Sequence, residues 1–208
     1  MPDNEDALMR APSDKYTFEQ MNMLIRNQRL WTQFAMWMRN FALGTLDDSR
    51  NLADTTNRLF EALPLDFFNM FRVFYGDEIA QQFLNIFSKF ISSTWPLLQA
   101  FRNNDQAALD SSTVQWYQTA DELAVFLARN NIYWNEDQWR SLLYQYIRAY
   151  IQGVIAYQNG EYGQEISIYD TIENISNRMG GYMARGIIAR NLATSLTCTE
   201  FPTEGYYG

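Results

Sequence analysis

The side chains that most often carry chemistry are scarce in this sequence. None of its 208 residues is histidine, which excludes imidazole acid–base catalysis and histidine metal ligation. Carboxylates, tyrosines and one thiol are the remaining candidates. Asp170 and Glu173 stand three residues apart, a spacing that could offer oxygen ligands to a hard cation. Acids near the start of a helix also complement its dipole, and we favour that structural role for this pair.

The other candidate groups are poorly placed for catalysis. Asp121 and Glu122 are adjacent and diverge on a helix, so we expect them to face solvent or to act as caps. The single cysteine, Cys198, rules out an intramolecular disulfide and has no basic neighbour to activate it. We expect a free thiol there, with pairing between chains as the alternative. An enzyme that uses Asp54, Asp170 or Tyr146 is the least favoured reading, because the sequence shows no set of nucleophile, base and orienting group.

No phosphate-binding loop is predicted either. The only Gly-Gly pair, Gly180-Gly181, lies inside a helical pattern and not between a strand and a helix. A formal net charge of −8, with arginines scattered singly, argues against nucleic acid as a partner. No apolar run is long enough to span a membrane. The acidic, polar N-terminal residues do not resemble a secretory signal, so we expect a cytoplasmic location, with later release or surface display left open.

Composition points to contacts as much as to a core. Aromatic residues make up 16% of the chain and charged residues 19%, and only Lys15 and Lys89 are lysine. Protein interfaces are depleted in lysine and enriched in aromatic residues and arginine. The composition therefore indicates either a self-associating protein or a compositional bias without functional meaning.

Helical periodicity dominates the elements that would position these residues. Thr17-Phe-Glu-Gln20 reads as a capping box that starts a helix over 18–46. Pro64 should interrupt the next helix, Gly76 should end a short one, and Pro96 should kink or divide a third. The remaining helices are predicted over 106–130, 136–158 and 161–190. We therefore predict an all-α antiparallel bundle of about six helices, four of them long core helices.

We predict that the chain has three parts. A polar arm covers 1–16, the bundle covers 17–192, and an aromatic-tipped tail covers 193–208. The segment Leu30–Phe34 weakly resembles Leu142–Tyr146, which could mark a degenerate duplication.

Four segments resemble a family of small all-helical bacterial proteins that often carry the label acetylglutamate kinase. The resemblance covers about residues 28–188 and rests on the segments Leu30–Arg39, Phe74–Gly76, Tyr133–Trp139 and Tyr169–Glu173. An amino-acid kinase is an α/β protein with a glycine-rich phosphate loop, and this sequence predicts neither. We therefore do not expect acetylglutamate kinase activity.

The resemblance also implies a polar or metal site inside the bundle, built by three histidines, a Glu and an Asp. The positions that correspond in this sequence are Phe34, Phe90, Tyr146, Gly153 and Gly181. Each lacks the ligand atom, as if rings had filled a cavity and glycines had made room for them. We expect these five positions to converge on one core layer whose ancestral site is lost, with no catalytic residue, metal or cofactor.

The resulting functional prediction is a non-enzymatic structural protein that assembles with itself as a homo-oligomer or polymer. The tail would supply anchors, namely Cys198, Phe201, Tyr206 and Tyr207. The alternative is a ligand-binding bundle with an apolar, aromatic-lined pocket or a residual carboxylate metal site.

Overall fold

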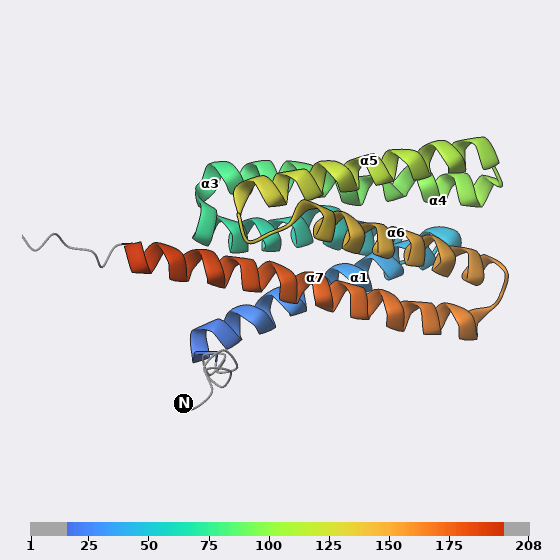
Figure 1. Ribbon diagram of the computed structural model, residues 1–208. Coiled ribbons are helices and arrows are strands. Elements are labelled where there is room, and N and C mark those ends of the chain that lie inside the picture. Colours follow the sequence, from blue (N-terminus) through green and yellow to red (C-terminus); the bar gives the residue numbers. More distant parts are fainter. Residues whose placement is uncertain (1–15, 198–208) are drawn as a thin grey trace, which may run out of the picture.

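A computed structural model describes the backbone of residues 16–197 and the side chains of residues 16–193 (Figure 1). The described chain is all-α, without a strand, and packs as a bundle with antiparallel contacts, as predicted. Its elements are α1 (Phe18–Leu46), α2 (Leu52–Asn57), the π-helical turn η1 (Arg58–Ala62), α3 (Leu63–Ser92), α4 (Thr94–Asn103), α5 (Gln106–Asn130), α6 (Glu136–Gln158) and α7 (Tyr162–Thr197).

Side-chain caps start three of the long helices. At α1 the Thr17 hydroxyl accepts a hydrogen bond from the Gln20 amide N–H at 3.2 Å, and the Gln20 side chain accepts one from the Thr17 N–H at 2.9 Å. Asp105 and Asn135 cap α5 and α6 through the backbone N–H three residues on. Each cap satisfies an amide that has no partner inside its helix, so the predicted starts are confirmed.

Two of the three predicted helix breaks, at Gly76 and near Pro96, are present in the structure. The predicted interruption at Pro64 is wrong, because η1 widens the backbone just before it and the chain stays helical into α3. A wider turn relieves the clash between a proline ring and the carbonyl group one turn earlier. Gly76 has φ 80° and ψ 172° and breaks the helical geometry within α3, as predicted. The division near Pro96 is also confirmed, since α4 begins two residues before it.

The helices form layers that run along one axis (Figure 1). α6 lies between α7 on one side and α5 on the other, and α1 packs against α7. α7 runs antiparallel to α1, since Glu165 near its start pairs with Arg39 and Gly180 further on lies against Gln28. Short connections between consecutive helices produce this arrangement.

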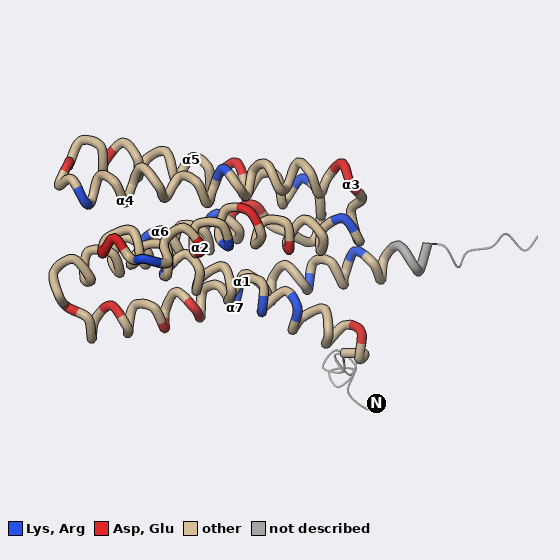
Figure 2. The backbone as a smooth tube through the Cα atoms, turned by 180° about the vertical axis from the view of Figure 1, so that it is seen from behind, with Lys and Arg blue, Asp and Glu red and all other residues tan. Residues whose placement is uncertain are grey.

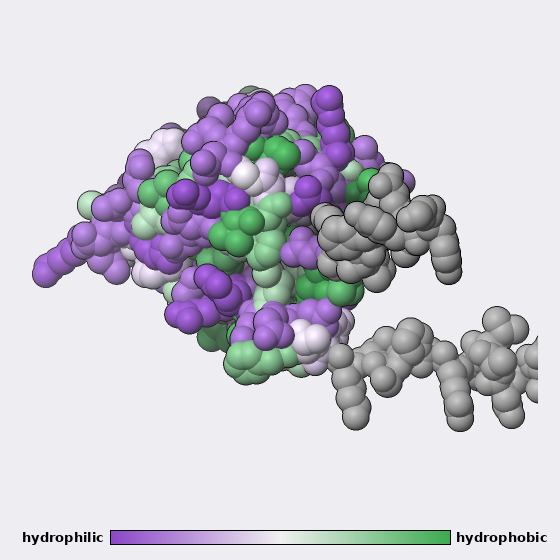
Figure 3. All heavy atoms as spheres, turned by 90° about the vertical axis from the view of Figure 1, so that its left-hand side faces the viewer, coloured by the Kyte–Doolittle hydropathy of each residue, from purple (hydrophilic) through white to green (hydrophobic). Residues whose placement is uncertain are grey.

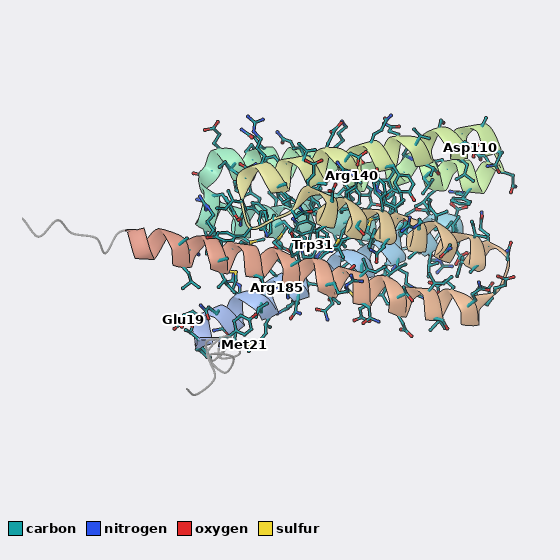
Figure 4. All side chains as sticks on the ribbon, viewed as in Figure 1. Glu19, Met21, Trp31, Asp110, Arg140 and Arg185 are labelled. Carbon is teal, nitrogen blue, oxygen red and sulfur yellow. The ribbon has the colours of Figure 1, made fainter. Side chains whose placement is uncertain are left out.

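Aromatic side chains from several helices fill the centre. Trp31 of α1 points into the interior (Figure 4) and contacts four other rings at centroid separations of 5.3–6.0 Å. Each large apolar side chain buried in this way contributes about 1.5–3 kcal/mol relative to an exposed one. Residues at helical spacing along one face of α1 are all buried; they are Leu24, Trp31, Phe34, Met38, Phe41 and Thr45.

The last helix is longer than predicted. α7 continues to Thr197, where the sequence suggested an end near residue 190 and a tail from 193. No glycine or proline lies between Gly186 and Pro202, so nothing local stops the helix at the predicted point. The predicted assembly anchors Cys198, Phe201, Tyr206 and Tyr207 lie outside the described residues.

Candidate functional site

Three of the five predicted former-site residues meet in the core. Phe34 of α1 lies 5.0 Å from Tyr146 of α6 and 6.2 Å from Phe90 of α3, measured between ring centroids. All three side chains are fully buried. The aromatic layer formed by these three rings therefore joins three helices, each of which brings its ring inward through helical spacing from other buried positions.

The two glycines lie elsewhere. A Cβ placed on Gly153 would have Ile168 and Ile172 of α7 as its nearest neighbours, with the Ile168 Cγ2 at 3.5 Å. A Cβ on Gly181 would meet the ends of Arg185 and Gln28, at 3.2 Å and 3.5 Å. Neither glycine makes room for a ring of the aromatic layer. The structure thus brings three of the five positions together, and their descent from ligands stays a prediction.

The aromatic layer is not equipped for acid–base chemistry. Burial raises the pKa of the Tyr146 phenol well above its ordinary value, so the group stays protonated at neutral pH. Its hydroxyl makes no hydrogen bond within the described part of the chain, and the same holds for the indole N–H groups of Trp31 and Trp139. The Phe34 ring contacts both of the other rings, so the layer is packed ring against ring. Packing is the role that this geometry supports.

A small hollow lies beside Gly153, next to an ion pair that the sequence analysis missed. Its volume is about 20 Å³, and Tyr150 and Tyr169 help to line it. Arg39 of α1 donates two hydrogen bonds to Glu165 of α7, both 2.6 Å long, and Glu165 is only 5% exposed. Arg39 and Glu165 are 126 residues apart in the sequence, so no local sequence pattern could predict that they pair.

The Arg39–Glu165 ion pair links two helices, α1 and α7, and its geometry favours a structural role. Its two-pronged geometry is the strong form of the arginine–carboxylate contact. The hydrogen bond to Glu165 raises the pKa of the Arg39 guanidinium, which lies 4.9 Å from the centre of the Tyr169 ring. With both charges satisfied by each other, the pair ties the start of α7 to the middle of α1.

The predicted carboxylate candidates are spread over the surface. Asp170, Glu173 and Asp54 are exposed. Asp121 accepts hydrogen bonds from Arg140 and Tyr144, whereas Glu122 accepts from Lys89; these partners lie in different helices, so the predicted divergence is confirmed. Within residues 16–197, no three cysteine, aspartate or glutamate side chains gather in a way that could hold a metal ion.

One end of the bundle exposes apolar side chains. The three most exposed large hydrophobic residues of the described chain are Ile132, Phe18 and Val73, at 89%, 78% and 72%. They stand at the α5–α6 connection, at the start of α1 and just before Gly76 in α3, and Figure 1 places these three points at the same end. Figure 3 looks onto that end and shows hydrophobic patches among hydrophilic side chains. We call these three residues the end-face residues.

Comparison with protein families, curated proteins and solved structures finds no match to this chain. In the part of the chain that the structure describes, no helix combines the length and the apolar character needed to cross a membrane.

Proposed function

We propose that this protein is a non-enzymatic helical scaffold that associates with further copies of itself through the end-face residues. The observation that carries the proposal is that Phe18, Val73 and Ile132, the most exposed apolar side chains described, share one end of the bundle. Removing such side chains from water is the main driving force of association, at about 25 cal/mol per Å². Single exposed hydrophobic residues are ordinary, but several at one end are typical of a contact surface.

The packed core supports a scaffold over a ligand carrier. The alternative function requires an aromatic-lined pocket, and the rings of Phe34, Phe90 and Tyr146 occupy that space themselves. The hollow beside Gly153, at about 20 Å³, has room for little more than one water molecule. A residual carboxylate metal site has as little support as an apolar pocket. Asp121 and Glu122 each pair with a basic side chain, and the other candidate acids are exposed to solvent.

We also propose that the bundle arose by degenerate duplication, in line with the resemblance to the bacterial family. Leu30–Phe34 and Leu142–Tyr146 are the two segments of similar sequence, and the ring centroids of their last residues lie 5.0 Å apart. Two copies related by a two-fold axis place equivalent positions at equal distances from that axis, so equivalent positions close to the axis contact each other. The contact between Phe34 and Tyr146 is what a duplicated hairpin would show if both residues lay close to such an axis.

The oligomeric state tests the self-association. We would measure molar mass by light scattering and sedimentation over a wide concentration range, for the wild type and for Phe18→Ser/Ile132→Asn. The double variant should dissociate at least about tenfold more readily, since hot-spot truncations cost about 2 kcal/mol or more. Val114→Asn is the matched control, because Val114 is 57% exposed on α5 and is not an end-face residue. A wild-type protein that stays monomeric throughout, or equal weakening by the control, would refute the proposal.

A further inference from the structure

A charged cleft lies between α1, η1 and the first part of α3. It has a volume of about 390 Å³. Four of its residues follow one another on α1 at helical spacing, which places them on one face; they are Arg26, Arg29, Leu30 and Gln33. The opposite wall comes from η1 and α3 and consists of Arg58, Asp66, Asn69 and Met70.

The charge of this cleft is unbalanced. Arg58 donates a hydrogen bond of 2.8 Å to Asp66 and is the only one of the three arginines with an ion-pair partner there. Arg26 and Arg29 make no hydrogen bond or ion pair within the described residues. Three guanidinium groups against one carboxylate leave a local charge of +2, on a chain whose net charge is −8. Figure 2 shows basic positions along the N-terminal half of α1 and an acidic position at its start, which is Glu19.

The π-helical turn places the third arginine. In a regular α-helix, residues eight apart such as Arg58 and Asp66 differ by about 80° around the axis. η1 absorbs about one residue in its wider turn, which brings the two positions to within roughly 20° of the same face. The Arg58 guanidinium also lies 5.9 Å from the centre of the Trp37 ring, so it is held on two sides. The π-helical turn η1 thus sets the position from which the Arg58 side chain lines the cleft.

We propose that this cleft is a binding site for a small oxyanion with at least two negative charges, such as a phosphate ester or a dicarboxylate. The planar guanidinium fork matches the oxygen geometry of both groups and binds them through paired hydrogen bonds. Gln33 and Asn69 add amide donors at the sides, and Leu30 and Met70 provide apolar surface for a carbon skeleton. The volume falls in the range of small-molecule sites, about 300–1,000 Å³.

This site does not depend on self-association. None of the end-face residues lines the cleft, so either proposal can fail without the other. A ligand of charge −2 would neutralise the local excess and remove the repulsion between Arg26 and Arg29, which are neighbours on α1. Binding should therefore also raise the melting temperature of the protein.

Calorimetric titration of the full chain with pyrophosphate and with succinate, at matched ionic strength, tests the site and separates the two chemical sources. Acetate serves as the monoanion reference. We expect one of the two polyvalent anions to bind, and binding to weaken at least about tenfold in Arg26→Gln/Arg29→Gln, because this variant removes two of the three guanidinium groups that line the cleft. Arg129→Gln is the control for a change of charge outside the cleft: it removes one positive charge from an exposed position on α5, which does not line the cleft, and should bind as the wild type does.

Thermal unfolding of the unliganded variants checks that they fold; neither arginine is buried, so both should melt close to the wild type. The proposal is overturned if neither polyvalent anion binds the wild type, if acetate binds equally well, or if Arg129→Gln weakens binding as much as the double variant does. The last two outcomes would show attraction to charge in general and not recognition by this cleft.

Discussion

The substitution Gly180→Ala should destabilise the bundle strongly, although alanine is the better helix former. A Cβ at this position would lie 2.6 Å from the Gln28 Cα, 2.7 Å from the Asn27 carbonyl oxygen and 2.8 Å from the Gln28 nitrogen. All three atoms belong to the backbone of α1, so no side-chain rotation can relieve the overlap. α1 and α7 must move apart, and they form an extensive helix pair in the fold.

The adjacent substitution Gly181→Ala provides the matched comparison. Its Cβ would meet only the mobile ends of Arg185 and Gln28, at 3.2 Å and 3.5 Å, and both can turn away. Replacing glycine by alanine inside a helix stabilises by about 1 kcal/mol when nothing else changes. Overpacking against a rigid neighbour costs about 1–3 kcal/mol, and the separation of two helices belongs at the upper end.

We therefore expect Gly180→Ala to lower the free energy of unfolding by about 2 kcal/mol net and Gly181→Ala to leave it unchanged or raise it by up to about 1 kcal/mol. The difference of about 2–3 kcal/mol corresponds to about 4–12 °C in melting temperature for a chain of this length. Urea and thermal unfolding followed by circular dichroism measure both quantities. Equal stabilities for the two variants would show that α1 and α7 do not approach each other closely at Gly180.

Three further substitutions probe the interior. Glu165→Gln should lower the free energy of unfolding by about 1–3 kcal/mol, which is less than for a fully buried ion pair because Arg39 is partly exposed. The same change at the exposed Glu122 should lower it by at most about 0.5 kcal/mol. Equal losses in urea unfolding would contradict a stabilising role for the Arg39–Glu165 pair. Tyr146→Phe removes a buried hydroxyl without a partner and should be neutral or stabilising by up to about 1–2 kcal/mol, so a clear loss in calorimetric melting would reveal a missed partner. Burial raises the pKa of Tyr75 to about 12; its neutral form is favoured in the folded state, so the associated stability is complete below pH ~10 and is lost between pH ~10 and ~12. Tyr157, whose pKa is also raised to about 12 by its hydrogen bond to Asp47, contributes over the same pH range. Tyr75→Phe should therefore reduce the loss in part in unfolding curves recorded against pH, and an unchanged slope would exclude a contribution from Tyr75.

Much of the fold could be predicted because its signals are local. The capping residues Thr17, Asp105 and Asn135 lie within three residues of the amides that they satisfy, so the starts of their helices were readable. Burial along α1 followed the spacing of its apolar residues in the same way. Where the prediction erred, at Pro64, the outcome depended on how the helix adjusted around the ring, and η1 is one of several adjustments that a proline permits.

The candidate sites could be predicted only in part. The resemblance pointed to positions on separate helices, and the structure brings the rings of Phe34, Phe90 and Tyr146 together. The cleft of Arg26, Arg29 and Arg58 was not predicted, because Arg58 is far from the other two in the sequence and lies near them only where η1 packs against α1. Charge clusters of this kind arise from packing and have no local signature.

Gly180 and Gly181 illustrate the difference between what local sequence patterns predict and what depends on the packing of the helices. Helical periodicity runs through both residues, so their place inside a helix could be predicted without the structure. In the folded bundle Gly180 faces the backbone of α1, whereas Gly181 faces the ends of flexible side chains, and no local pattern predicts this difference. Consecutive residues point about 100° apart around a helix, and the direction in which a neighbour lies is set by how the whole bundle packs.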